Sequence, residues 1–230
     1  MILSRLLLNP LERNVARDLG SPDEMHKTLW NLFSPEKPDG ANGRRVLFRT
    51  ELHTETVPPS VLVLSWKAPQ WKRLPSGYIA GNEAGCCHSI DYEPVPAGRS
   101  GGGIPIHNGD IFQFRLVANP TRRVGKFDHR QPVPKRKIPG KRVGLLKEEE
   151  QCDWLIRKGT VHGFELGRDL QIEPLGMVRS TAKGAKRKWL SVRYSGSIRV
   201  VEPAAFCDAL LAGIGPAKGF GFGLLSIKLS

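Results

Sequence analysis

The sequence predicts an α+β protein made of two tandem ferredoxin-like domains, each with the element order βαββαβ. In each half a strand, a helix and two strands follow one another, and the second half ends with a helix and a strand. An internal repeat supports this duplication. Residues 5–13 (RLLLNPLER) resemble residues 115–123 (RLVANPTRR), since each has an apolar strand, Asn-Pro and a following Arg.

These observations predict three segments of the chain. We expect a first domain at 1–93, a Gly/Pro-rich linker at 94–109 and a second domain at 110–230. The first domain carries His26, and the second carries a basic hairpin and a Gly-rich loop.

The first half begins with an apolar run at 2–8, which we interpret as a buried strand that Asn9-Pro10 ends. A helix follows, because Ser21 suits the N-cap, Pro22 suits N1 and Glu24 at N3 completes a capping box. Its core face recurs at helical spacing and comprises Met25, Leu29, Leu32 and Phe33. Strands are expected at 45–52 and 61–66, a short helix around Trp71, and a linker or long loop over the Gly/Pro-rich residues 81–109.

The second half opens with a strand at 110–118, in which Phe112 and Phe114 alternate on one face and are expected in the core. Residues 121–142 carry nine Lys/Arg against one acid, which predicts a mobile basic loop. A helix is expected at 147–158. Later elements are strands at 164–166, 170–175 and 197–201, a strand, basic turn and strand over 177–194, a helix at 202–212 and a last strand at 224–229.

Composition indicates a polyanionic partner. The net charge is +13 and the pI is near 9.9, which favours nucleic acid or a membrane surface. No run of about 18 apolar residues exists, so we expect no membrane span. The first eight residues lack a basic n-region, so we expect no secretory signal. The four cysteines do not form a disulfide framework and suit a reduced cytoplasm.

We expect no metal ion and no other cofactor. Cys86-Cys87-His88 lacks the two-residue gap of a zinc knuckle. The acids lie mostly at helix starts, whereas a two-metal nuclease site needs clustered carboxylates.

The most informative stretch is GIGPAKGFGFG at 213–223, which has five glycines and Lys218 between a helix and a strand. Exposed N–H groups of such a loop can form an anion site. It is neither a P-loop, since no Ser or Thr follows Lys218, nor a dinucleotide fingerprint, since the strand comes after the loop. A ligand-free helix-to-strand connection is the alternative interpretation.

Residues 213–227, GIGPAKGFGFGLLSI, resemble the signature loop of the CRISPR-associated repeat-processing endoribonucleases, above all the CasE family of type I-E Cascade complexes. The N-terminal strand with Asn-Pro and the helix with EMHKTL at 24–29 are also similar. The resemblance implies paired ferredoxin-like, RRM-like domains. It also implies metal-independent cleavage of CRISPR repeat RNA at the base of its stem-loop, with 2′,3′-cyclic phosphate and 5′-hydroxyl ends. The resemblance further implies that the product stays bound and that the partners are this RNA and other Cascade subunits.

The resemblance implies a catalytic role for His26, whose imidazole titrates near neutral pH and suits either proton transfer of this reaction. Relatives often have Tyr three residues before the histidine, where this chain has Asp23, and Lys a few residues after it, where this chain has Asn31. Asp23 would raise the pKa of His26, or merely complement the helix N-terminus. Lys27 and Lys218 are candidates for steadying phosphate charge. Ser34 binds substrate or caps the helix.

The basic turn around 183–188 is the second candidate site, either as a solvated hairpin tip or as an RNA-binding element. The resemblance implies that it enters the groove of an RNA stem, which proteins recognise mostly by shape and backbone. The expected RNA-binding residues are Arg122, Arg123, Lys141, Arg142, Arg179, Lys183, Lys186, Arg187, Lys188, Lys218, Gly219 and Gly221.

The sequence leaves two functional interpretations open. The first is the metal-independent endoribonuclease. The second is a non-catalytic RNA-binding subunit that holds the processed stem-loop in a larger complex, an alternative that Asp23 at the usual tyrosine position keeps open.

Overall fold

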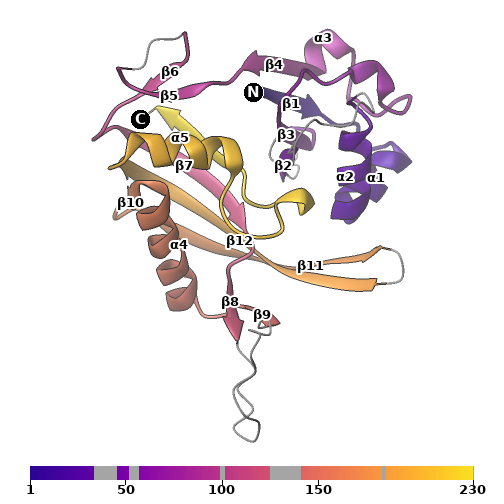
Figure 1. Cartoon of the computed structure of the whole chain (residues 1–230). Coiled ribbons are helices and arrows are strands. Elements are labelled where there is room, and N and C mark those ends of the chain that lie inside the picture. Colours follow the sequence, from indigo (N-terminus) through magenta and orange to yellow (C-terminus); the bar gives the residue numbers. More distant parts are fainter. Residues whose placement is uncertain (34–45, 52–56, 99–101, 125–140, 183–184, 230) are drawn as a thin grey trace, which may run out of the picture.

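The computed structural model describes residues 1–33, 46–51, 57–98, 102–124, 141–182 and 185–229, and for 181, 182, 185, 186 and 229 it describes the backbone alone. Figure 1 shows two sheets with their helices, one in each half of the chain. Within the described part of the chain, no helix is long and apolar enough to span a membrane.

The first sheet is antiparallel and has four strands, β1 (Ile2–Leu7), β2 (Leu47–Glu51), β3 (Ser60–Ser65) and β4 (Cys87–Asp91). Their order across the sheet is β2-β3-β1-β4. The chain therefore places its first strand in the middle and its last strand at the edge beside it, which is the arrangement of a βαββαβ domain. Strand β4 lies in the stretch that we expected to be a linker or long loop.

Four helical segments lie in the described part of the first half. They are α1 (Arg13–Gly20), α2 (Pro22–Trp30), the 3₁₀ turn η1 (Trp71–Arg73) and the short α3 (Glu83–Cys86). The sequence did not predict α1. The short helix around Trp71 and the core face of α2 are confirmed, because all four residues of that face are buried, namely Met25, Leu29, Leu32 and Phe33.

The capping box predicted at the start of α2 is wrong. Ser21 is the N-cap residue, but its side chain makes no capping hydrogen bond. The carboxylate of Glu24 instead accepts a hydrogen bond from Lys27 and lies 3.8 Å from the guanidinium of Arg17. Two nearby cations therefore compete successfully with the backbone N–H for the Glu24 side chain.

The second sheet comprises β7 (Ile111–Ala118), β10 (Phe164–Leu166), β11 (Gln171–Ala182), β12 (Ala185–Val200) and β13 (Leu225–Leu229). Its order is β10-β12-β7-β13, and β11 also pairs with β12. This repeats the order of the first sheet, so the predicted pair of tandem ferredoxin-like domains is confirmed. The β11–β12 hairpin is longer than predicted and projects beyond the sheet toward the side of α1 and α2 (Figure 1).

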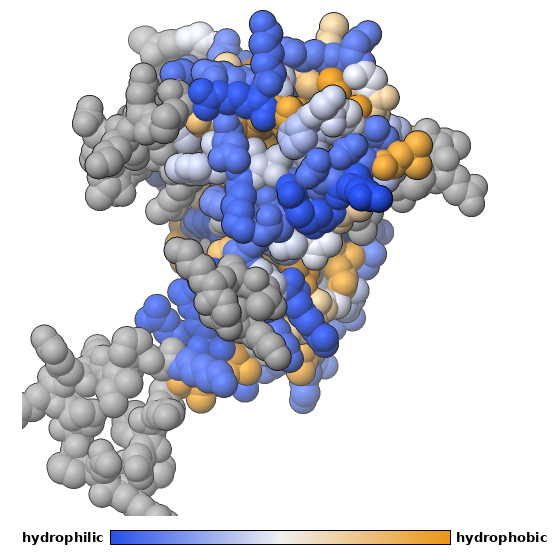
Figure 2. Space-filling model, turned by 90° about the vertical axis from the view of Figure 1, so that its right-hand side faces the viewer, coloured by the Kyte–Doolittle hydropathy of each residue, from blue (hydrophilic) through white to orange (hydrophobic). Residues whose placement is uncertain are grey.

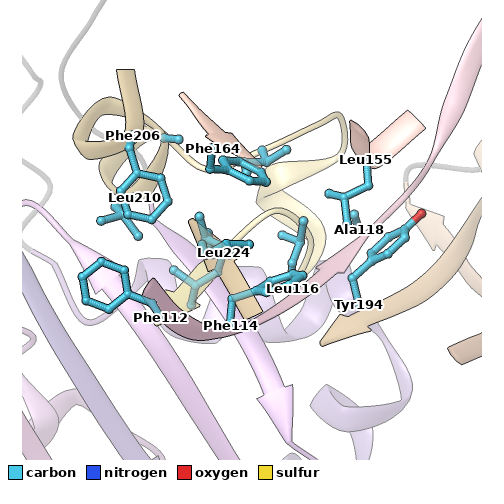
Figure 3. Packing of buried hydrophobic residues seen from close by; sticks show 14 of the residues in the cluster. Phe112, Phe114, Leu116, Ala118, Leu155, Phe164, Tyr194, Phe206, Leu210 and Leu224 are labelled. Carbon is cyan, nitrogen blue, oxygen red and sulfur yellow. The ribbon is translucent and has the colours of Figure 1, made fainter. Parts of the chain in front are cut away.

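Helices α4 (Glu148–His162) and α5 (Pro203–Ala212) cover one face of the second sheet (Figure 1). Their side chains meet those of β7 in the core that Figure 3 shows, where Phe206 and Leu210 approach Phe112. Phe112 and Phe114 are 5% and 4% exposed, so the prediction that they are core residues is confirmed.

Two short strand pairs flank the second sheet. The parallel pair β5 (Pro94–Pro96) and β6 (Ile104–Ile106) occupies the segment predicted as a linker, and Ile106 is buried in the core of the second half. The connection between the halves is thus packed rather than free. The other pair, β8 (Thr121–Val124) and β9 (Lys141–Gly144), forms the two ends of the segment 121–142 that was predicted as a basic loop, so the prediction is wrong at these ends. Residues 125–140 lie outside the described residues.

A buried arginine joins the two halves. Arg49 on β2 is 4% exposed, and its Nη1 donates to the carbonyl oxygen of Arg115 at 3.1 Å and to Oγ of Ser226 at 2.9 Å. Its Nε donates to Glu51 at 2.7 Å, and Glu51 also pairs with the Arg115 guanidinium at 3.2 Å. Because a buried charge must keep its partners, this network fixes the orientation of the first sheet against the second.

Candidate functional site

The Gly-rich loop between α5 and β13 closes on itself at its base. The N–H of Ile214 donates to the carbonyl oxygen of Gly223 at 2.8 Å, and the N–H of Gly223 donates to Val117 on β7 at 2.8 Å. Both ends of the loop are thereby tied to the second half. Its middle, which includes the 3₁₀ turn η2 (Lys218–Phe220), extends to the first half.

Glycine is required where the loop meets β2. Gly221 has φ +84°, and a Cβ there would lie 3.1 Å from Cε2 of Phe48. Gly213 has φ +72°, and a Cβ there would lie 2.9 Å from Cδ1 of Leu47. Glycine alone adopts this conformation without strain and permits such a close approach. The glycine pattern therefore serves the contact between the halves.

Ala217 adopts the left-handed conformation with φ +63°, the one such non-glycine among the residues described. This costs about 1–2 kcal/mol for an L-residue. The turn places Lys218 and Gly219 opposite α2. Strain of this kind at a loop tip is often associated with a functional site.

His26 on α2 lies at the point where the loop reaches the first half. It lines a cleft of about 480 Å³ together with Trp30, Lys218 and Gly219. A Cβ on Gly219 would be 3.7 Å from Cε1 and 3.8 Å from Nδ1 of His26, so the loop covers one edge of the imidazole. The cleft therefore combines a titratable ring from one domain with a cation from the other.

Burial lowers the pKa of His26 below its ordinary value of 6.5, and the carboxylate of Asp23 opposes this by raising it. The lowering by burial is the larger effect. Asp23 therefore raises the pKa of His26, as expected, but the net pKa is still below its ordinary value. Nδ1 of His26 and Oδ2 of Asp23 are both buried without a hydrogen-bond partner in the described structure. The imidazole is thus mainly neutral at neutral pH.

The predicted catalytic residues are brought together only in part. Lys218 lines the cleft with His26, and its Nζ also donates to the carbonyl oxygen of Ala212 at 2.8 Å. Lys27 instead forms an ion pair with Glu24 on the exposed side of α2. Ser34 lies outside the described residues.

An aromatic row passes through the site, and sequence analysis missed it. Trp30 stacks on His26 with ring centres 5.8 Å apart, and Trp66 lies 5.6 Å behind Trp30. On the other side, Phe220 lies 6.4 Å from His26 and stacks on Trp189 of β12 at 4.5 Å. The histidine is therefore flanked by one aromatic ring from each half of the chain.

The β11–β12 hairpin carries the basic residues predicted to bind RNA. Cross-strand partners share a face of a hairpin, and Arg179 pairs with Lys188. Arg187 lies on the other face with Trp189 and contacts the Phe220 ring at 5.6 Å. Arg179, Arg187 and Lys188 are exposed. The face of the molecule with α1, α2 and the hairpin is mostly hydrophilic in Figure 2.

Other predicted RNA-binding residues lie apart from the cleft or beyond the description. Arg122, Arg123, Lys141 and Arg142 are exposed on β8 and β9, where Arg122 pairs with Glu150 of α4 at 3.4 Å. Lys183 and the side chain of Lys186 lie outside the described residues.

The described residues contain no cluster of three or more His, Cys, Asp or Glu side chains that could hold a metal ion.

Paired ferredoxin-like domains, a basic hairpin and a histidine in a cleft that Lys218 also lines define an RNA-binding protein with a candidate group for proton transfer. Comparison with known proteins gives the family. The chain belongs to the CRISPR associated proteins, whose family model matches residues 1–228.

Two curated relatives match almost their whole length. The chain is 32% identical over 238 aligned residues to the CRISPR-associated endoribonuclease Cse3 of Thermus thermophilus, with 99% of both chains covered. It is 29% identical to the Cascade subunit CasE of Escherichia coli K12, with 99% of this chain and 98% of the relative covered. The resemblance to the CasE family seen in the sequence is confirmed.

Solved structures of similar proteins have the same fold. Cse3 bound to a 19-nucleotide RNA superposes with a TM-score of 0.79 at 30% identity, covering 99% of this chain and all of that one. A Thermus thermophilus Cse3 complex with an RNA that represents the pre-cleavage state gives 0.73 at 30% identity, covering 99% and 98%. Cas6e of Escherichia coli, at 24% identity and a TM-score of 0.65 over both full chains, supports the fold alone.

Proposed function

We propose that this protein is an endoribonuclease that cleaves CRISPR repeat RNA at the base of its stem-loop and keeps the stem-loop bound. The relatives named above support the activity, because Cse3 is an endoribonuclease by name and has been solved in a pre-cleavage RNA complex. The single observation that carries the proposal is the position of His26, which lines a cleft between the two halves together with Lys218.

The proposed reaction uses the 2′-hydroxyl of the RNA as the nucleophile and needs no metal ion. A neutral His26 takes the proton of the 2′-OH as its oxygen forms a bond to phosphorus. The bond from phosphorus to the 5′-oxygen breaks, and that oxygen leaves with a proton from solvent. The products are a 2′,3′-cyclic phosphate and a 5′-hydroxyl.

The lowered pKa of His26 favours the base role, because a base must be unprotonated when the reaction begins. Nδ1 is buried next to Gly219, so Nε2 is the nitrogen that we assign to the substrate. We assign to Lys218 the stabilisation of negative charge on the phosphate, since it is the cation that shares the cleft with His26.

The RNA stem is proposed to lie along the β11–β12 hairpin. Its exposed cations, Arg179, Arg187 and Lys188, would contact phosphates. Lys183 and Lys186 stay predicted RNA-binding residues. Arg187 and Trp189 of this hairpin contact Phe220, whose ring lies beside His26. An RNA stem bound along the hairpin would therefore be positioned relative to His26.

We further propose that the protein acts in the cytoplasm as a subunit of a Cascade complex. The CasE relative is a Cascade subunit by name. None of the four cysteines, Cys86, Cys87, Cys152 and Cys207, forms a disulfide in the described structure, in keeping with a reducing compartment. The division into domains at 1–93 and 110–230 stays a prediction.

The test is cleavage of a labelled CRISPR repeat RNA from the same genome in EDTA, by the wild type and by His26→Ala. We expect one cut at the stem base that leaves a cyclic phosphate and is lost in the variant, with RNA binding unchanged. Tight binding without cleavage by either protein would instead support the non-catalytic RNA holder, and Asp23 in place of the usual tyrosine would then be the first residue to revert.

A further inference from the structure

We propose that Trp30 is a base-binding residue, on which the unpaired nucleotide next to the cleaved phosphate stacks. This inference rests on the proposed function, because it assumes that RNA is cut beside His26. It goes further by assigning a base subsite and the kind of nucleotide it accepts, namely one that is free to leave the RNA stack.

The exposure of Trp30 is the first observation. All five tryptophans lie in the described part of the chain, and Trp30 alone is exposed, with 41% of its surface accessible. It occupies the end of α2, one turn after His26, and lines the same cleft. A large apolar ring left open at the edge of a cleft is a place where a flat ligand can bury surface.

The second observation is that Trp30 is held in place from behind. Its ring centre is 5.6 Å from that of Trp66, and Trp66 in turn lies 4.8 Å from Phe33, which is buried. A ring fixed in this way loses little freedom when a base stacks on it. The site is therefore preorganised for stacking.

The other aromatic ring beside His26 is less available. Phe220 stacks on Trp189 at 4.5 Å, and the guanidinium of Arg187 lies 5.6 Å from its centre. Trp30 also has aromatic neighbours, but it is exposed, whereas Phe220 is half-buried under these contacts. The base subsite is consequently assigned to the Trp30 side of the imidazole.

The reaction itself requires such a subsite. The attacking 2′-oxygen must line up with the bond to the leaving 5′-oxygen, and the stacked geometry of an RNA helix does not provide this alignment. A nucleotide that leaves the stack allows it, and proteins hold unstacked bases on aromatic side chains. At the base of a stem one neighbour of the cut phosphate is paired and the other is free. Trp30 would hold the free one.

Binding is measured with repeat RNA that carries a 2′-deoxy nucleotide at the cut, which removes the nucleophile and prevents cleavage. The fluorescent base 2-aminopurine is placed in turn at each of the two positions flanking the cut and at one position in the loop. We expect quenching by the wild-type protein at the unpaired flanking position, loss of quenching with Trp30→Ala, and its return with Trp30→Phe. Leu11→Ala, an exposed residue of the first half, is the control and should behave as wild type.

Cleavage gives an independent readout. An abasic nucleotide at the same position should slow the wild type about tenfold, and Trp30→Ala should slow cleavage of normal RNA by about the same factor, since stacking of one base is lost in both cases. The two changes together should cost no more than either alone. The pH profile should be unchanged in Trp30→Phe, because His26 keeps an aromatic neighbour.

The outcomes separate the inference from the proposed function. Failure of the wild type to cut unmodified repeat RNA would refute the function. Normal cutting without quenching at either flanking position would refute the base subsite. Additive losses from the abasic RNA and Trp30→Ala would also refute it, because they would show that Trp30 acts only on His26.

Discussion

The imidazole of His26 and the phenyl ring of Phe220 lie 6.4 Å apart, centre to centre, across the junction of the two domains. His26 comes from α2, the second helix after β1, and Phe220 comes from the loop before the last strand. The surroundings of the proposed catalytic group are therefore completed only when both domains have folded and docked. Residues that set this docking should affect cleavage without touching RNA.

Two glycines of the loop should differ in how much stability an alanine substitution costs. Gly221→Ala places a Cβ 3.1 Å from Phe48 at φ +84°, so we expect a loss of about 1–2 kcal/mol of unfolding free energy and slower cleavage. Gly219→Ala meets His26 at an ordinary 3.7 Å and should leave stability within about 0.5 kcal/mol of wild type. Urea unfolding measures both, and equal effects of the two variants would contradict this account of the loop.

The pKa of His26 should fall further when Asp23 is neutralised. The Asp23 carboxylate stabilises the imidazolium and so raises this pKa, against the larger lowering by burial. In Asp23→Asn the acid limb of kcat/KM should move to lower pH, because His26 stays neutral and able to act as a base in more acidic solution. An NMR titration of the His26 ring measures the shift directly.

Glu24→Gln is the matched control for that experiment. Glu24 is the adjacent acid on α2, but it pairs with Lys27 and Arg17 rather than influencing His26. Its replacement should leave the pKa of His26 in place. A shift to higher pH in Asp23→Asn would overturn the assigned electrostatics.

Lys218 and Lys27 should differ in their importance for cleavage. Lys218 lines the cleft with His26, so Lys218→Ala should lower kcat about 100-fold, as expected when one group that stabilises transition-state charge is removed. Lys27 pairs with Glu24 on the exposed side of α2, and Lys27→Ala should change kcat only about twofold to threefold. Single-turnover kinetics with saturating enzyme measures this, and the reverse ranking would move the phosphate to the other side of α2.

Much of this fold can be predicted from the sequence because its signals are local. The alternating apolar residues of β7 and the Pro at the start of α5 indicate a strand and a helix without knowledge of the rest of the chain. Helix α1 gives no such signal. It has few apolar residues, and its buried Asp18 is stabilised by the hydroxyl of Tyr78, which donates to it at 2.8 Å from a distant part of the chain.

Only those parts of the candidate site that lie within a single sequence motif could be predicted. His26 and Lys218 stand out in short segments that resemble a known family. The aromatic row does not, because Trp30, Trp66, Phe220 and Trp189 come from separate elements and meet only through the packing of the two domains. Buried Arg49 was missed for the same reason, since its acceptors lie on β7 and β13.

Arg49 should be the most costly arginine to lose. Arg49→Ala leaves the carbonyl oxygen of Arg115 and the hydroxyl of Ser226 without their shared donor and removes a buried ion pair, so we expect a loss of about 3–5 kcal/mol of unfolding free energy. Arg115→Ala removes a half-exposed partner of the same Glu51 and should cost less than about 1 kcal/mol. Denaturant titration followed by tryptophan fluorescence measures both variants, and comparable losses would show that Arg49 does not tie the domains together.

The hairpin cations should determine how steeply RNA binding depends on salt. Each phosphate contact releases counterions, so the logarithm of the binding constant should fall linearly with the logarithm of salt concentration. Arg187→Ala and Lys188→Ala should each reduce that slope by roughly 0.9.

Arg168→Ala is the control, since Arg168 is exposed in the turn between β10 and β11, at the end of the sheet opposite the hairpin tip. Filter binding of the uncleavable repeat RNA over a range of salt gives the slopes. A slope unchanged by Arg187→Ala and Lys188→Ala but reduced by Arg168→Ala would place the RNA stem on the other end of the second domain, away from Phe220 and His26.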